Sequence, residues 1–177
     1  RKYRSQSLGD LVGQDVIVTI LTNALKHDAL SHAYLLCGPR GTGKTSTARI
    51  LAKAINCQNP VGLEPCNQCV LCQKITDGTC VDVVEVDAAS NRGIDEIRGL
   101  REQLHFQPME AKKKIYIIDE VHMLTDAAFN ALLKTLEEPP AHVLFMLATT
   151  DPQKVPITIR SRCQVLYFRK IAVAVIV

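Results

Sequence analysis

The chain has 177 residues, of which 47% are hydrophobic and 22% are charged, a composition typical of one folded globular domain. It has no apolar run long enough for a transmembrane helix and no apolar segment behind its basic start, so we expect neither a membrane span nor a signal peptide. The net charge of +3 is too small to argue nucleic-acid binding from charge alone. The odd number of cysteines, 7, favours a reducing, cytoplasmic setting with metal-binding thiols over a disulfide framework.

Short apolar runs alternate with amphipathic runs along the chain. Amphipathic spacing predicts helices over residues 14–27, 44–56, 94–104 and 126–137. Short apolar runs predict strands over residues 34–37, 81–86, 115–118, 143–148 and 165–168. Apolar strands that alternate with helices indicate an α/β fold with a parallel sheet covered on both faces. The wholly aliphatic run 171–177 is an unusual end for a domain, so we expect either a truncated chain or one that continues into a further domain.

A glycine-rich run after the strand predicted over 34–37 matches the pattern G-x-x-x-x-G-K-[ST] at every fixed position. Such a loop wraps backbone N–H groups around a polyphosphate, and the helix that follows adds partial positive charge. Lys44 is expected to bridge the β- and γ-phosphates, and the Thr45 hydroxyl to bind Mg²⁺. The alternative is a turn that merely resembles the pattern, and the correct flanking strand and helix argue against it. The predicted nucleotide-binding residues here are Gly38, Pro39, Arg40, Gly41, Thr42, Gly43, Lys44, Thr45 and Ser46.

Two adjacent carboxylates end the strand predicted over 115–118. Asp119 and Glu120 therefore lie at the carboxyl edge of the sheet, where ligands bind in open α/β folds. We expect Asp119 to hold Mg²⁺ through water and Glu120 to polarise the attacking water. The alternative is an acidic strand end that caps the next helix. The phosphate loop upstream favours a catalytic pair, and the adjacency of the two carboxylates favours hydrolysis over transfer to a hydroxyl.

A cysteine-rich insert over residues 57–72 follows the second predicted helix. Its thiols have the spacing C-x8-C-x2-C-x2-C and belong to Cys57, Cys66, Cys69 and Cys72. Four thiolates this close can form a tetrahedral Zn²⁺ site, which would be structural because no position is open to substrate. An iron–sulfur cluster is the rival, although the fourth cysteine lacks the proline that follows it in ferredoxins, and unligated thiols are a third alternative. The remaining cysteines lie in or beside apolar runs and are expected in the core: Cys37, Cys80 and Cys163.

Together these motifs resemble the bacterial clamp-loader ATPase subunits of DNA polymerase III. Besides the phosphate loop and the cysteine insert, the matching segments are residues 1–4, 10–14, 87–90, 118–124, 130–140, 147–152 and 161–163. The resemblance implies an AAA+ nucleotide-binding domain over 1–170, of the P-loop NTPase class, with a five-stranded parallel sheet. The run 171–177 departs from the polar helix expected at that point, and we do not expect the lid and collar domains of the family within these 177 residues.

The resemblance also implies residue roles and partners. It implies that Val12 and Gly13 line the adenine pocket, that Thr150 is the sensor-1 residue, and that Arg162 is the arginine finger that reaches the ATP of a neighbouring subunit. The expected cofactors are ATP, Mg²⁺ and Zn²⁺. The expected partners are the other subunits of a ring-like pentamer, the sliding clamp, and primed DNA held through its phosphates, with no membrane.

Several alternatives stay open at this point. A clamp-loader-like structural subunit would bind no ATP, which the intact Lys44, Thr45 and Asp119 argue against; an unrelated P-loop kinase or helicase is the second rival. Arg162 has no carboxylate within four residues, and an ordinary surface arginine is the alternative to a finger. The run 90–93 either holds a DNA phosphate or caps the helix after it.

Overall fold

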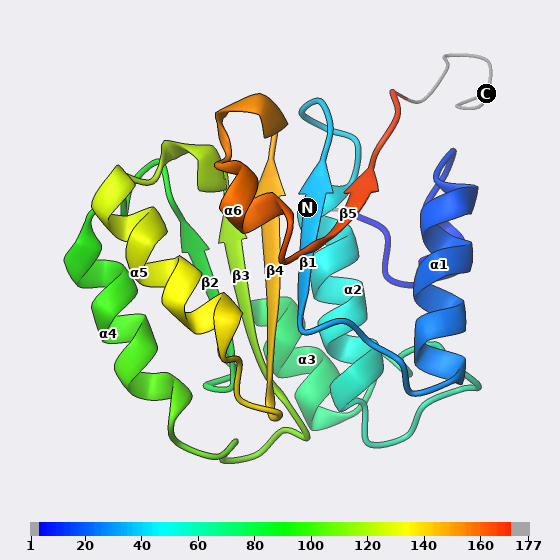
Figure 1. Cartoon of the computed structure of the whole chain (residues 1–177). Coiled ribbons are helices and arrows are strands. Elements are labelled where there is room, and N and C mark those ends of the chain that lie inside the picture. Colours follow the sequence, from blue (N-terminus) through cyan, green and yellow to red (C-terminus); the bar gives the residue numbers. More distant parts are fainter. Residues whose placement is uncertain (1–3, 171–177) are drawn as a thin grey trace.

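A computed structural model describes residues 4–170 as a five-stranded parallel sheet with helices on both faces (Figure 1). The strands are β1 (Ala33–Cys37), β2 (Val83–Asp87), β3 (Lys114–Asp119), β4 (Val143–Thr149) and β5 (Gln164–Tyr167). Their order in the sheet is β2-β3-β4-β1-β5, with every neighbouring pair parallel. The predicted parallel sheet is confirmed, and the apolar strands β1, β3 and β4 are its buried centre.

Helices cover the two faces of the sheet in two groups. The helices are α1 (Asp15–Lys26), α2 (Lys44–Asn56), α3 (Val70–Asp77), α4 (Ile94–Leu104), α5 (Asp126–Glu137) and α6 (Ile157–Arg160). Short 3₁₀ turns are η1 (Leu8–Asp10), η2 (Val121–Met123) and η3 (Pro152–Lys154). Helices α4, α5 and α6 share one core with the sheet, whereas α1, α2 and α3 share the other. All four predicted helices are present with nearly the predicted bounds.

Strand β1 shows how one strand supplies both cores. Ala33, Leu35 and Cys37 belong to the core under α4 and α5, whereas Tyr34 and Leu36 belong to the core under α2. Successive side chains of a strand point to opposite faces, so a strand covered on both sides must be apolar throughout. This double burial fixes the register of β1 and therefore the place where the chain leaves the sheet at Gly38.

Helix α3 is the main element that the sequence pattern does not predict. It begins at Val70, inside the cysteine insert, so that only residues 70–72 of the insert are helical and the rest is loop. Its apolar positions, Leu71 and Ile75, are buried, and Gly78 ends the helix in a left-handed conformation. The run is only eight residues long and carries two metal-ligand candidates close by, and this combination hides its helical spacing.

Within residues 4–170, no helix has both the length and the apolar character needed to cross a bilayer. The aliphatic run 171–177 and the first three residues of the matching segment 1–4 lie outside the described residues.

Candidate functional site

A cavity of about 760 Å³ lies at the carboxyl edge of the sheet. Three segments line it. The N-terminal wall, defined as residues 4–14, contributes Arg4, Ser5, Asp10, Leu11, Val12 and Gln14. The phosphate loop and the start of α2 contribute Arg40, Gly41, Thr42, Gly43, Lys44, Thr45 and Ser46. Strand ends contribute Asp87, Asp119 and Glu120. The cavity therefore joins a basic, backbone-rich side to an acidic side.

The phosphate loop, residues 38–45, is shaped by glycines with positive φ angles, and Gly38 also has no room for a side chain. The N–H of Gly38 donates a hydrogen bond of 3.2 Å to the Thr149 carbonyl on β4. A Cβ atom on Gly38 would lie 2.7 Å from the Phe168 carbonyl oxygen, far inside contact distance. Gly41 and Gly43 have φ angles of +76° and +95°, which other residues rarely adopt. The loop is therefore held open by its own backbone.

Lys44 lies inside the curve of this loop. Its Nζ donates hydrogen bonds of 2.7 Å to the carbonyls of both Gly38 and Pro39, and the residue is only 6% exposed. Burial lowers the pKa of Lys44, against the opposing effect of the nearby Glu120 and Asp119 carboxylates. A desolvated cation beside a helix N-terminus favours a polyphosphate anion, which compensates its charge directly.

Thr45 and Asp119 meet across the gap between α2 and β3. The Thr45 hydroxyl donates a hydrogen bond of 2.7 Å to Asp119 Oδ2. Asp119 Oδ1 accepts a second bond, of 2.9 Å, from the N–H of Glu120. One hydroxyl and one carboxylate at this spacing are the oxygen donors that Mg²⁺ takes from proteins that bind it together with phosphate. The residues present therefore fit a magnesium site.

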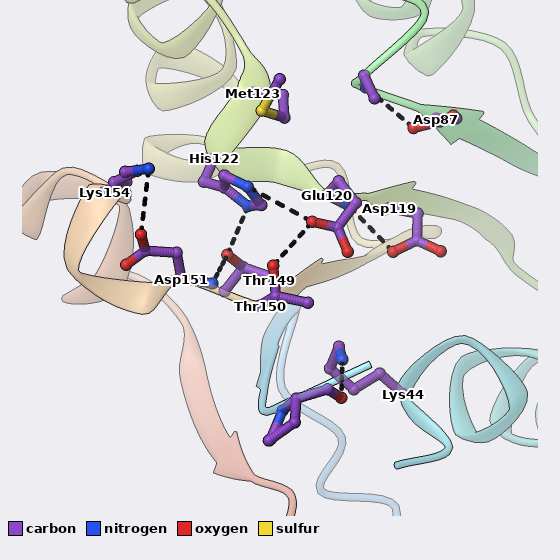
Figure 2. A network of polar contacts seen from close by, with 12 residues as sticks. Lys44, Asp87, Asp119, Glu120, His122, Met123, Thr149, Thr150, Asp151 and Lys154 are labelled. Atoms are coloured by element: carbon purple, nitrogen blue, oxygen red, sulfur yellow. Dashed lines mark hydrogen bonds and ion pairs between the residues drawn. The ribbon is translucent and has the colours of Figure 1, made fainter. Parts of the chain in front are cut away.

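Glu120 is held in an unusual conformation by a polar network (Figure 2). Its φ and ψ are 51° and 45°, a left-handed conformation that costs a non-glycine residue about 1–3 kcal/mol. The Thr150 hydroxyl donates a hydrogen bond of 3.0 Å to Glu120 Oε2, and His122 Nε2 lies 3.4 Å from the same oxygen. His122 Nδ1 in turn lies 2.9 Å from the Thr149 hydroxyl oxygen. This network directs the carboxylate to the cavity beside Asp119.

The N-terminal wall is joined to the rest of the domain by Gln14, which is 4% exposed. Its Nε2 donates a hydrogen bond of 2.8 Å to the Arg169 carbonyl, and its Oε1 accepts one of 3.2 Å from the Arg169 N–H. Within the wall, Asp10 Oδ2 accepts bonds of 3.0 Å from the N–H groups of Gln6 and Ser7. The Gln6 N–H is the main cause that lowers the pKa of Asp10.

The four cysteines of the insert come together as one cluster. Their Sγ atoms all lie within 4.8 Å of one another, and the Sγ atoms of Cys57 and Cys69 are 4.0 Å apart. Zinc bound to four sulfurs at about 2.3 Å requires sulfurs about 3.8 Å apart, so the cluster fits this ion. Backbone N–H groups of Gln68 and Cys69 donate to Cys66 Sγ at 3.4 Å and 3.2 Å. N–H donors of this kind stabilise thiolates.

The pKa values of two thiols in the cluster move in opposite directions. Burial raises the pKa of Cys69, but hydrogen bonds from the backbone of Gln58 and Cys72 outweigh burial and lower it to about 6. Burial, which is the largest cause, raises the pKa of Cys72. Closely packed thiols cannot all ionise next to one another, and a divalent cation among them removes this conflict.

The structure brings most of the predicted nucleotide residues together, but not all of them line the cavity. Among the described residues, Gly13, Gly38 and Pro39 support the walls without lining the cavity, and Thr150 reaches it through Glu120. Cys37 and Cys80 are buried as predicted, and the half-buried Cys163 packs against the core.

Arg162 lies away from this cavity, in the turn between α6 and β5. Its Nη2 forms an ion pair of 2.8 Å with Glu137 Oε1, at the end of α5, and its Nη1 donates to the Thr158 carbonyl at 2.8 Å. No carboxylate lies within four residues of Arg162 in the sequence, and this partner is 25 positions away along the chain. The Arg162 side chain is one-third exposed and does not line the cavity of its own chain.

Sequence reasoning missed six lining residues: Arg4, Ser5, Asp10, Leu11, Gln14 and Asp87. Asp87 ends β2 and pairs in register with Asp119 on β3. The sequence did offer a signal for Asp87, because it ends an apolar run just as Asp119 does, and the ends of parallel strands meet at one edge of the sheet. Gln14 carries no comparable signal, because its partner, Arg169, is 155 positions away.

The fold and the loop define a phosphate-loop α/β domain. Residues 13–172 match the family described as DNA polymerase III, delta subunit, and the chain belongs to this family. It is 56% identical over 177 residues to the DNA polymerase III subunit tau of Bacillus subtilis (strain 168), which covers all of this chain and 31% of that protein. It is 51% identical over 169 residues to subunit gamma of Buchnera aphidicola subsp. Acyrthosiphon pisum (strain APS), covering 96% of this chain and 46% of that protein.

These matches confirm the resemblance drawn from the motifs, and the chain spans less than half the length of either relative. Among solved structures, the RuvB Holliday junction branch migration motor of Thermotoga maritima has a TM-score of 0.65 at 21% identity, covering 97% of this chain and 50% of that one. At this identity the likeness shows a shared fold.

Proposed function

We propose that this chain is the AAA+ nucleotide-binding domain of a clamp-loader motor subunit, which binds ATP with Mg²⁺ and hydrolyses it during DNA replication. The observation that carries the proposal is the meeting of Lys44 and Thr45, at the start of α2, with Asp119 and Glu120, at the end of β3, around one cavity. The membership of the chain in a DNA polymerase III family supports the setting. Binding and hydrolysis each have their own residues here.

Binding uses the phosphate loop. The N–H groups at the start of α2 and the Lys44 ammonium face the position of the β- and γ-phosphates, and this ammonium exchanges its two loop carbonyls for phosphate oxygens. Thr45 and Asp119 would hold the Mg²⁺ ion, which supplies charge stabilisation at the phosphates when bound. Val12, an exposed apolar residue of the N-terminal wall, offers the base a surface.

Hydrolysis uses Glu120 as the base that takes a proton from the attacking water. A base of this kind contributes about 10²–10⁴-fold in rate. The hydrogen bond from Thr150 orients the carboxylate and leaves Oε1 for the water. In the family's terms, Thr150 is the sensor-1 residue. Its hydroxyl, which donates to Glu120 here, is proposed to hydrogen-bond the γ-phosphate or the attacking water when ATP is bound.

Arg162 is proposed to act in trans, on the ATP of the next subunit of a ring. Its place on a partly exposed turn, outside its own cavity, supports this role. Mixed rings test it: a subunit with Arg162→Ala is placed beside one with Lys44→Ala in a defined order. Activity in one order only supports action in trans, whereas equal activity in both orders means that Arg162 acts in its own subunit or only holds the interface.

The sliding clamp and primed DNA are proposed as partners of the assembled protein.

The cysteine cluster is proposed to bind one structural Zn²⁺ ion per chain. Elemental analysis tests the metal: one zinc per chain supports it. Visible absorbance of an iron–sulfur cluster, or a zinc content near zero, contradicts it.

The central experiment compares nucleotide binding with turnover. Lys44→Ala is expected to weaken binding of a fluorescent ATP analogue, and Lys26→Ala, an exposed lysine on α1, is the matched control. Glu120→Gln is expected to retain binding while hydrolysis falls by about 10²–10⁴-fold. Absence of ATP binding would indicate a structural subunit and contradict the proposal, and binding without hydrolysis in the assembled, DNA-stimulated protein would contradict the motor role.

A further inference from the structure

Glu64, in the loop of the cysteine insert, is hydrogen-bonded to the N-terminal wall, although the two lie more than 50 residues apart along the chain. Its Oε2 accepts a hydrogen bond of 2.9 Å from the Leu8 N–H, and its Oε1 accepts one of 3.1 Å from the Gly9 N–H. Both N–H groups belong to η1, whose first donors have no partner within the turn. Hydrogen bonds to a charged group are the strong ones in proteins, so this carboxylate fixes where the wall runs.

Asn67 makes a second link between the insert and the wall, through Gln6. Its Nδ2 donates a hydrogen bond of 3.2 Å to the Gln6 carbonyl, and its Oδ1 accepts one of 2.6 Å from Lys53 Nζ. Lys53 also donates to Gln6 Oε1 at 2.8 Å and is only 2% exposed, on the buried side of α2. Insert, wall and the helix after the phosphate loop therefore meet in one partly buried polar contact.

The position of these two side chains depends on the cysteine cluster. Asn67 follows Cys66 in a left-handed conformation, with φ of +58°, in the turn whose next N–H groups donate to Cys66 Sγ. Glu64 lies two residues before the same cysteine and pairs with Val61 in an isolated bridge. A loop with so little core is ordered by its metal, because metal binding and folding are then one equilibrium.

The wall, in turn, lines the nucleotide cavity. Ser5, Asp10, Leu11 and Val12 all face it, and the wall has no regular structure beyond the three residues of η1. We propose that Glu64 and Asn67 are positioning residues for the nucleotide site, through which the metal-bound insert holds the N-terminal wall against the cavity. The inference rests on the proposed binding of ATP in that cavity.

The first test measures ATP affinity in variants of the intact protein with its zinc in place. Glu64→Gln and Asn67→Ala are each expected to raise the Kd of a fluorescent ATP analogue by about 3- to 30-fold. This range corresponds to part of the free energy of the charge-assisted hydrogen bonds that each substitution removes. Asp77→Asn and Gln68→Ala change exposed side chains that take no part in these hydrogen bonds, and they are the matched controls. Lys44→Ala marks full loss of phosphate binding.

The second test follows the wall itself by amide hydrogen exchange. Glu64→Gln, and removal of zinc by a chelator, are each expected to speed exchange at the Leu8 and Gly9 amides, while the amides of β3 stay protected. Adding zinc back to the unmodified protein is expected to restore both protection and ATP affinity. Zinc content and melting temperature of Glu64→Gln, compared with Asp77→Asn, show that the variant is folded.

The outcomes separate the inference from the function on which it rests. If the unmodified protein binds ATP and Glu64→Gln binds it equally well, the inference is overturned and the proposed function stands. Unchanged exchange at Leu8 and Gly9 after zinc removal also overturns the inference. If the unmodified protein binds no ATP and Lys44→Ala behaves identically, the proposed function fails, whatever the amides show.

Discussion

The two walls of the cavity proposed to bind nucleotide are built in different ways. The phosphate loop is formed where one strand turns directly into one helix, and its glycines, its buried lysine and the adjacent β4 carbonyl hold it in shape. The N-terminal wall has almost no structure of its own and is held by hydrogen bonds of Gln14 to Arg169, of Glu64 to η1 and of Asn67 to Gln6, each spanning 55 or more positions. One wall is therefore stable wherever the sheet is folded, whereas the other depends on a second unit, the cysteine insert, and with it on the Zn²⁺ ion proposed there.

The largest expected effect comes from filling the phosphate loop. Gly38→Ala places a methyl group 2.7 Å from the Phe168 carbonyl oxygen, on a backbone with a φ of +155°. Overpacking together with backbone strain predicts a loss of about 2–5 kcal/mol in the free energy of unfolding, and loss of ATP binding with it. Urea denaturation and nucleotide titration measure the two effects.

Gly41→Ala is the matched control for this substitution. Its added Cβ meets no atom within 4 Å, although its φ of +76° is also left-handed. Only the strain remains, so a smaller loss of about 1–2 kcal/mol is expected. Equal effects of the two substitutions would show that space around Gly38 is not what shapes the loop.

Loss of the metal is expected to separate the two walls. Cys69→Ser removes one of four clustered sulfur ligands, so that the insert and the N-terminal wall should lose their order while the sheet and the phosphate loop keep theirs. Hydrogen exchange resolved by residue checks this pattern, with Cys163→Ser as the control thiol outside the cluster. Cooperative unfolding of the whole sheet in Cys69→Ser would contradict the account.

Asp82, like Glu64, is a carboxylate that accepts hydrogen bonds from the backbone N–H groups of a distant segment, but it lies outside the cysteine insert. Its carboxylate accepts hydrogen bonds from the N–H groups of Met109, Glu110 and Ala111, at 2.7–3.0 Å. Burial opposes these bonds, but the bonds prevail and lower the pKa of Asp82. Asp82→Asn should cost about 1–3 kcal/mol in the free energy of unfolding, whether or not zinc is bound.

The sign of the pH dependence follows from the lowered pKa. A carboxyl group with a lower pKa in the folded state stabilises the fold fully above its unfolded pKa of about 3.9, and this contribution disappears as the pH falls through the folded value. Asp82→Asn should therefore lose most stability at neutral pH and show a smaller difference from the unmodified protein in acid. A difference that stays constant between pH 7 and the acid limit would contradict this assignment.

The smallest expected effect concerns the orientation of the base. Thr150→Val keeps the shape of the side chain and removes the hydroxyl that donates to Glu120 Oε2. Loss of one hydrogen bond to a carboxylate predicts hydrolysis slower by about 10-fold or somewhat more. Nucleotide affinity should change little, and Thr150→Ser should restore the rate. A ten-fold loss of affinity in place of rate would place Thr150 in binding instead.

The same contrast explains how much the sequence could predict. The phosphate loop, Asp119 with Glu120, and the four cysteines are encoded by residues adjacent or regularly spaced along the chain, so the pattern alone places them together. The contacts from Glu64 to η1 and from Arg162 to Glu137 join residues far apart, and no local spacing marks either pair. Helix α3 escaped prediction because its apolar positions are few and its first turn is shared with the cysteine cluster.

The most direct test of the account is amide hydrogen exchange of the zinc-bound protein with and without ATP and Mg²⁺. If nucleotide lies between the two walls, protection should increase both in the phosphate loop, residues 38–45, and in the N-terminal wall, residues 4–14. Protection of the phosphate loop alone, or of neither segment, would contradict the claim that both walls hold the nucleotide.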